Sequence, residues 1–346
     1  MSDSILIVSF KLLGDIIVQT PAIKSIKKAY PNSKLSVLID DRFSDVLVGN
    51  SYVDEIFTYP ISKYKNSSFL KKIYLSISIL LKLRKQVFTK VLLMDRTSFG
   101  CLIAFFSGAK ERIGLKKQSL SFFLNKKLEY REGSMDYIDF YNLLASSLNI
   151  TQQDRKTELF VDLKTLENTK KILLQFFPTK NQFISIHVGA SREDKRWSFE
   201  QCALFIKKVL NSNSETGIII MCGPKEKYLV DELFLHLDGS LKNALFNAGE
   251  LYLKELVAFF SLSQCILCYD SASRHVAAAL GKSTIVLMNE WNLANWKLYS
   301  ESEGQFIITP QNEVENSYGI KNINYEIVYD KYLQISLHNT TAFHPN

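Results

Sequence analysis

The chain has 346 residues, of which 47% are hydrophobic and 22% are charged, and its formal net charge is +7. This length and balance suit a globular protein with one large domain or two ordinary ones. The charge is too small for a dedicated nucleic-acid binder. It fits a protein that handles anionic partners or lies near an anionic membrane, although frequent lysine explains it equally well.

The five cysteines argue against a disulfide framework in a chain of this size. Cys265 and Cys268 have CxxC spacing, but they fall in an expected strand, and we interpret them as core residues. The N-terminus enters a strand directly, without the pattern of a signal peptide, and no apolar stretch is long enough to span a bilayer. We therefore expect a cytoplasmic protein.

Short apolar runs alternate with helical patterns through the first half of the chain. This rhythm is typical of an α/β fold, in which a parallel sheet is covered by helices on both faces. The expected strands are 5–9, 34–39, 55–59, 90–95 and 111–114. The expected helices are 15–30, 42–49, 69–86, 98–107 and 134–148.

The segment 63–90 is both basic and aliphatic. We interpret it first as a crossover helix with a solvated lysine face. The alternative is contact with a membrane or with an anionic lipid head group.

The second half repeats the α/β rhythm after a join near 162–180, where Lys, Asn and Thr accumulate. The expected strands are 183–188, 217–222, 264–269 and 283–288, and the expected helices are 199–210, 225–236, 252–261 and 271–280. Gly281 is placed to end the last of these helices. The predicted domains are 1–162 and 163–322, followed by a C-terminal helix and tail over 323–346.

In open α/β sheets, ligands bind beyond the carboxyl ends of the strands. One such loop is HVGASREDKRW, in which Gly189, Ala190 and Ser191 precede Lys195 and Arg196. Small residues let backbone N–H groups approach a phosphate, and the cations neutralise it. This pattern favours a phosphate site over a plain loop with solvated charges.

A second loop is CYDSASRHVAAALG, in which Asp270 ends a strand and Ser271, Ala272 and Ser273 open a helix. The free N–H groups of a helix N-terminus form a ready anion site. Alternatively, Asp270 simply caps its helix. His275 lies one turn further and either reaches the same ligand or only packs.

The opening segment SFKLLGDIIVQTPAI has a single glycine, Gly14, before Asp15. It lacks the G-x-G-x-x-G fingerprint, so a nicotinamide enzyme is disfavoured, and no P-loop occurs elsewhere. Asp15 could stabilise its helix end or act as a general base. The chain also lacks Asp-x-Asp, which favours cations and a helix dipole over Mg²⁺ at a leaving diphosphate, and no plausible zinc spacing appears.

Taken in order, these motifs resemble those of the bacterial heptosyltransferase family (glycosyltransferase family nine). The resemblance covers nearly the whole chain, through ILIVSFKLLGDIIVQTPAIKSIKKAYPNSKLSVLI, VGNSYVDEIF, SGAKERIG, MDYIDFYNLLASSLNI, ISIHVGASREDKRWSFEQ and YDSASRHVAAALGKSTIVLM. It implies a GT-B fold, with two Rossmann-like domains facing across a cleft. It also implies an inverting, metal-independent transfer of a heptose from ADP-heptose to the lipopolysaccharide inner core.

The resemblance implies roles for individual residues. Asp15 matches the family's general base, Lys195 matches the lysine that steadies the leaving diphosphate, and His275 matches the histidine of the second motif helix. The N-terminal domain would hold the lipid-linked acceptor, with Lys11, Gly14, Lys63 and Arg96 as candidate contacts. The C-terminal domain would hold the nucleotide sugar through Gly189, Ala190, Ser191, Arg196, Glu226, Asp270, Ser271, Ala272, Ser273 and His275.

These implied partners are a nucleotide sugar and a lipid-linked glycan, with no cofactor, no metal and no nucleic acid. Peripheral contact with the inner membrane is compatible with them. The chain departs from the family pattern at Val188, Ala272, Arg274 and the segment Asn289-Glu290-Trp291. Because these departures cluster at the donor site, a different nucleotide sugar, a nucleotide-sugar epimerase and a binding protein without turnover stay open as alternatives.

Overall fold

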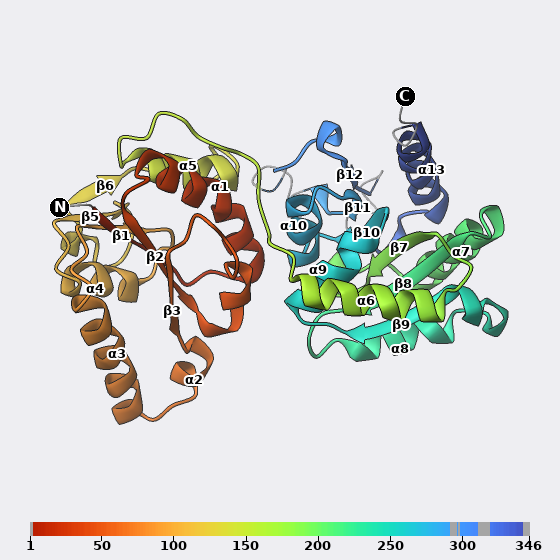
Figure 1. Cartoon of the computed structure of the whole chain (residues 1–346), viewed down its shortest axis with the longest axis horizontal. Helices are drawn as coiled ribbons and strands as arrows, with labels where there is room; N and C mark the ends of the chain where they lie inside the picture. Colours follow the sequence, from red (N-terminus) through yellow and green to blue (C-terminus); the bar gives the residue numbers. More distant parts are fainter. Residues whose placement is uncertain (1–2, 291–295, 297, 311–318, 342–346) are drawn as a thin grey trace. The chain divides into compact units, whose positions relative to one another are not determined.

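The computed structural model describes residues 3–290, 296, 298–310 and 319–341, with side chains in the last helix described up to 337. Its internal contacts divide the chain into two compact units, Met1–Phe160 and Val161–Asn346 (Figure 1). Within the described residues, no helix combines the length and the apolar character needed to cross a membrane.

The first unit is built on a six-stranded parallel sheet in the order β3-β2-β1-β4-β5-β6. Helices cover both faces of this sheet (Figure 1). Its strands are β1 (Ser4–Ser9), β2 (Lys34–Asp40), β3 (Glu55–Tyr59), β4 (Lys90–Leu93), β5 (Glu111–Leu115) and β6 (Lys126–Leu128). Its helices are α1 (Leu13–Ala29), α2 (Ile61–Lys65), α3 (Phe69–Arg84), α4 (Ser98–Phe106) and α5 (Tyr137–Ser146).

The second unit has a parallel sheet of the same size, in the order β12-β11-β10-β7-β8-β9. Its strands are β7 (Gln182–His187), β8 (Thr216–Cys222), β9 (Leu245–Glu250), β10 (Cys265–Tyr269), β11 (Ser283–Leu287) and β12 (Gln305–Ile308). Its helices are α6 (Leu163–Phe176), α7 (Phe199–Ser212), α8 (Lys227–Leu235), α9 (Leu253–Leu262), α10 (Ala272–Ala279) and α13 (Tyr325–Thr341).

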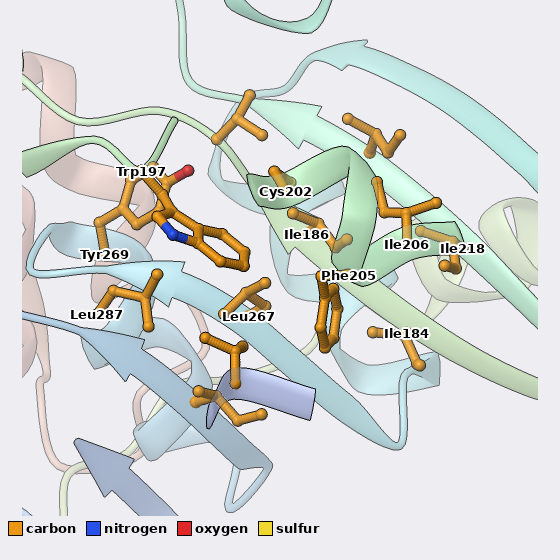
Figure 2. Packing of buried hydrophobic residues seen from close by; sticks show 14 of the residues in the cluster. Ile184, Ile186, Trp197, Cys202, Phe205, Ile206, Ile218, Leu267, Tyr269 and Leu287 are labelled. Carbon is orange, nitrogen blue, oxygen red and sulfur yellow. The ribbon is translucent and has the colours of Figure 1, made fainter. Parts of the chain in front are cut away.

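Trp197 anchors a loop of the second unit to its core. The indole is buried among side chains of the central strands and of α7, including Leu267 and Phe205 (Figure 2). Its Nε1 donates a hydrogen bond to the backbone oxygen of Ile323 at 2.7 Å, so its one polar atom is satisfied. Because Trp197 directly follows Lys195 and Arg196, the core fixes the end of the loop that carries these two cations.

The predicted α/β class is confirmed, since both sheets are parallel and their inner strands run as buried apolar segments. The helical segment expected at 42–49 is a 3₁₀ helix over Asp41–Val46. Helix α6 occupies much of the segment in which the join was expected, and the Asp162 carboxylate caps it by accepting from the backbone N–H of Thr165 at 2.8 Å.

Other local expectations are confirmed. Gly281 follows α10 with φ of +65°, a left-handed conformation that suits glycine at this position. Cys265 and Cys268 are both buried in β10 without a disulfide, as expected for core residues.

Candidate functional site

The loop between β1 and α1 is held in place by a buried carboxylate from the neighbouring strand. Asp95 follows β4, and its side chain accepts hydrogen bonds from the backbone N–H of Phe10 at 2.8 Å and of Thr97 at 2.9 Å. The Thr97 hydroxyl donates a further bond at 2.8 Å. These bonds fix the chain that enters the first turn of α1, where Asp15 lies.

Asp15 is a partly exposed carboxylate in the first turn of α1. Burial raises its pKa above the ordinary value of 3.8, while the nearby charge of Lys11 and the hydroxyl of Tyr141 act in the opposite direction. Tyr141 comes from α5, which packs against α1, and its side chain is fully buried. A carboxylate with a raised pKa is a better proton acceptor than an ordinary surface aspartate.

The other candidate acceptor contacts of the first unit differ in how near they lie to Asp15 along the chain. Lys11 and Gly14 belong to the loop and first turn that carry Asp15. Arg96 directly follows Asp95, and its guanidinium lies over the ring of Tyr130 at 5.4 Å. Lys63 lies apart on the short helix α2, where it is exposed and its charge acts on Asp41.

The second unit brings Lys195 and Asp270 together, as neighbouring loops at the carboxyl ends of β7 and β10 should. The Lys195 Nζ donates to the Asp270 carboxylate at 2.6 Å. The other carboxylate oxygen accepts from the Arg274 guanidinium at 3.0 Å. Ser271, not Asp270, occupies the N-cap position of α10, so the carboxylate binds two cations and is shared between them.

Arg274 is the largest fully buried side chain in the part of the chain that the structure describes. Its guanidinium also contacts the Met288 sulfur at 3.2 Å and donates to the Trp296 backbone oxygen at 2.6 Å. It therefore ties the end of β10 to the end of β11 and to the segment beyond. A buried guanidinium needs such partners, since an unpaired buried charge is strongly unfavourable.

A second cluster surrounds Gly189. The Arg196 guanidinium donates to the Ala190 backbone oxygen at 2.9 and 2.7 Å and lies 4.0 Å from the Glu226 carboxylate. A Cβ added at Gly189 would approach a Glu226 oxygen to 2.1 Å, so a larger residue there would displace this carboxylate. Ser191 is exposed at the outer end of the same loop.

The N-terminal turn of α10 carries the remaining donor candidates. The hydroxyls of Ser271 and Ser273 lie 2.7 Å apart, with Ala272 between them at the first helical position. His275 is buried, and its Nδ1 lies 3.0 Å from the Tyr299 hydroxyl. Burial and the charges of Arg274 and Lys195 lower the pKa of His275 well below 6.5, so the imidazole is neutral at physiological pH.

The departure at 289–291 has a structural role at its first residue. Asn289 is buried, and its Nδ2 donates to the Asp194 backbone oxygen at 3.1 Å, next to Lys195. It therefore helps to fix the turn that carries Lys195. Trp291 lies outside the described residues.

The buried His187, the last residue of β7, should make the folded protein less stable at acidic pH. Burial lowers the pKa of His187 from 6.5 to about 4. Between these two pH values the imidazole is protonated in the unfolded chain but not in the folded chain. The stabilisation is complete above about pH 6.5 and is lost as pH falls toward 4, by about 3 kcal/mol. Urea unfolding of wild type and His187→Gln between pH 4.5 and 7.5 checks this. We expect the difference in unfolding free energy to narrow as pH falls, whereas parallel profiles would contradict it.

Among the described residues, no group of three or more His, Cys, Asp or Glu could hold a metal ion.

The matching family model and the named relatives agree on one family. The model of Glycosyltransferase family 9 (heptosyltransferase) matches residues 77–324, which is more than half of the chain. A protein of Campylobacter coli named lipopolysaccharide heptosyltransferase 1 is 25% identical over 291 residues, which cover 82% of this chain and 83% of that protein.

Solved structures show the same fold. A glycosyl transferase family 9 protein from Veillonella parvula has a TM-score of 0.83 at 16% identity, covering 98% of this chain and 99% of that one. The E. coli ADP-heptose lps heptosyltransferase II has a TM-score of 0.79 at 18% identity, covering 97% and 99%. This likeness confirms the predicted GT-B class of fold.

Sequence reasoning did not identify several residues that shape the site. Asp95 ends the expected strand 90–95 and lies two residues beyond β4, a position that could have marked it. Tyr141 reads only as one aromatic in a helical pattern, and Arg274 reads only as a departure. Their contacts become visible only when segments distant in sequence are placed together.

Proposed function

Since the chain belongs to glycosyltransferase family 9, we propose that it transfers a heptose from ADP-heptose to a lipid-linked acceptor of the lipopolysaccharide inner core. The observation that carries the proposal is the Lys195–Asp270–Arg274 cluster at the N-terminus of α10. Relatives named as lipopolysaccharide heptosyltransferases support the donor and the acceptor, as does a solved structure titled as an ADP-heptose enzyme.

Asp15 would serve as the general base. Its carboxylate takes the proton of an acceptor hydroxyl while that oxygen attacks the anomeric carbon of the heptose. The new bond joins the acceptor oxygen to this carbon, and the bond from the carbon to the diphosphate oxygen breaks. Attack from the face opposite the leaving ADP inverts the anomeric configuration. The raised pKa of Asp15 suits this role.

The leaving diphosphate gains negative charge as its bond to the sugar breaks. Lys195 and the free N–H groups at the start of α10 would stabilise that charge, which assigns to the protein the part that Mg²⁺ takes in other sugar transferases. Asp270 fixes the ammonium group of Lys195 through a bond of 2.6 Å. Because the donors are held before the reaction, little reorganisation accompanies the transfer.

The departures from the family pattern favour a retained donor site. Arg274 and Asn289 are both buried and both bind groups that position Lys195. They therefore support a built cation site and argue against a degenerate binding protein. Family membership favours transfer over epimerisation.

A thermal-shift screen of ADP-, UDP-, GDP- and CMP-sugars tests the donor assignment. A ligand at 100 times its Kd stabilises the folded state by about 2.7 kcal/mol, which raises the Tm by roughly 5 °C. We expect ADP-heptose to give the largest rise. A larger rise with a sugar of another base would overturn the assignment.

A further inference from the structure

The outer face of helix α3 is apolar and exposed. Phe69, Leu70 and Tyr74 have exposed fractions of 76%, 77% and 69%. Successive helical residues turn by about 100°, so the exposed apolar positions fall within an arc of about 140°. We call this set the α3 face, and its members are Phe69, Leu70, Ile73, Tyr74, Ile77 and Leu81.

The α3 face is distinct from the side of the helix that packs on the sheet. Ile79 and Leu83 are buried and belong to the core of the first unit. Helix α3 is therefore apolar on two sides, of which its own unit covers one, and it lies along the outside of that unit (Figure 1). Apolar residues on all sides are typical of a helix that is covered, and a large exposed apolar patch marks an interaction surface.

The apolar surface extends beyond α3. Leu81 and Arg84 line a hollow together with Phe105 and Phe106 of the adjacent α4 region. Both phenylalanines are exposed, by 44% and 49%. An apolar surface that extends over two helices fits a partner with an extended surface of its own.

The charges around the α3 face identify that partner. The sequence has no acidic residue between Glu55 and Asp95, although the rest of the chain is rich in them. The cations in this stretch that precede β4 are Lys63, Lys65, Lys71, Lys72, Lys82, Arg84 and Lys85. A second copy of this chain would bring like charges together, whereas an anionic lipid surface is complementary to them.

We propose that the α3 face docks this protein on an anionic phospholipid bilayer. The apolar side chains insert at the level of the head groups, and the lysines contact lipid phosphates. This arrangement would hold the enzyme at the surface where a lipid-linked acceptor resides, and only that consequence rests on the proposed function.

Flotation of the full-length protein with vesicles tests the proposal without any substrate. We expect wild type to bind phosphatidylcholine vesicles that contain phosphatidylglycerol, and to bind less at high salt or with phosphatidylcholine alone. Arg84 and Lys85 are exposed cations that the same helical rotation places on the α3 face and beside it. Arg84→Gln with Lys85→Gln should weaken binding by about 25-fold, at about fivefold for each cation. Leu70→Ser with Ile77→Ser should weaken it at least about tenfold.

The matched control is Leu235→Ser, which alters a leucine that is 85% exposed on α8 and should bind as wild type does. Unchanged unfolding midpoints verify that the exposed substitutions leave the fold intact. The proposal is overturned if wild type fails to bind anionic vesicles, or if the α3 variants bind them normally. It is also overturned if those variants instead abolish a dimer in sedimentation, since the face would then join two copies. None of these outcomes depends on sugar transfer.

Discussion

Asp15→Asn is expected to lose sugar transfer while keeping its fold. The amide has nearly the shape of the carboxylate but cannot accept the acceptor's proton. Removing a general base lowers kcat by roughly 10²–10⁴-fold. The affinity for the nucleotide sugar should stay close to that of wild type, because the proposed donor residues belong to the second unit. Initial rates and donor titrations measure the two quantities separately.

The same variant should be as stable as wild type at neutral pH, or more so. Burial raises the pKa of Asp15. The folded state therefore favours the protonated form of this side chain more strongly than the unfolded state does. The stabilisation from this preference is present below the unfolded pKa of 3.8 and is lost as pH rises through the folded pKa. At pH 7.5 wild type therefore carries a cost that the neutral amide avoids, and the advantage of the variant should vanish near pH 3.

Asp231→Asn is the control for this prediction, because it makes the same change at an exposed position of α8. It should keep the wild-type kcat. If Asp15→Asn retained more than a tenth of the wild-type kcat, Asp15 would not be the base. If its Tm dropped by several degrees at neutral pH, the carboxylate would instead be a structural group.

Arg274→Met should produce the largest combined loss of stability and activity. The substitution removes a fully buried guanidinium and leaves the Asp270 carboxylate and the Trp296 backbone oxygen each short of a donor. Breaking a buried ion pair costs about 3 kcal/mol or more. Because Asp270 also holds Lys195, the ammonium group loses its fixed position, so kcat should fall and the KM for the donor should rise.

Two further variants separate positioning from simple unfolding. Arg274→Lys keeps the charge but cannot reach both Asp270 and the Trp296 oxygen, so it should restore stability more than kcat. Arg192→Met removes an exposed guanidinium of the same unit, which pairs with Asp194 at the surface, and should cost less than about 1 kcal/mol. Equal stability for Arg274→Met and wild type, measured by urea unfolding, would contradict the role given to Arg274.

The central strands could be predicted because the signal for a buried strand lies within its own short segment of sequence. A strand buried on both faces reads as a continuous apolar run. Strand β10 is buried along its whole length inside its sheet, and it begins one residue after the expected start and ends at the expected residue. Three strands were missed. Strands β6 (Lys126–Leu128) and β12 (Gln305–Ile308) are short, and β9 contains Gly249 and a register shift in its partner strand. These segments are stabilised as strands by hydrogen bonds to a neighbouring strand. Their own sequences therefore show no clear strand pattern.

The candidate site was predictable to the same extent. Asp15, Lys195 and Asp270 each follow a strand, and this position marks them from sequence. The pairing of Lys195 with Asp270 spans 75 residues, and the bond from Phe10 to Asp95 spans 85. Such contacts depend on strand order, which a single sequence specifies only weakly. For this reason Arg274 appeared as a departure from the family, although the structure gives it three partners.

A reconstituted transfer reaction tests the central claim most directly. The purified chain is incubated with ADP-heptose and a lipid A-core acceptor, and ADP release and the acceptor's mass are followed together. We predict that ADP appears only when acceptor is present, and that the acceptor gains the mass of one heptose residue. Release of ADP without acceptor, or an acceptor of unchanged mass, would contradict the assignment of this chain as a heptosyltransferase.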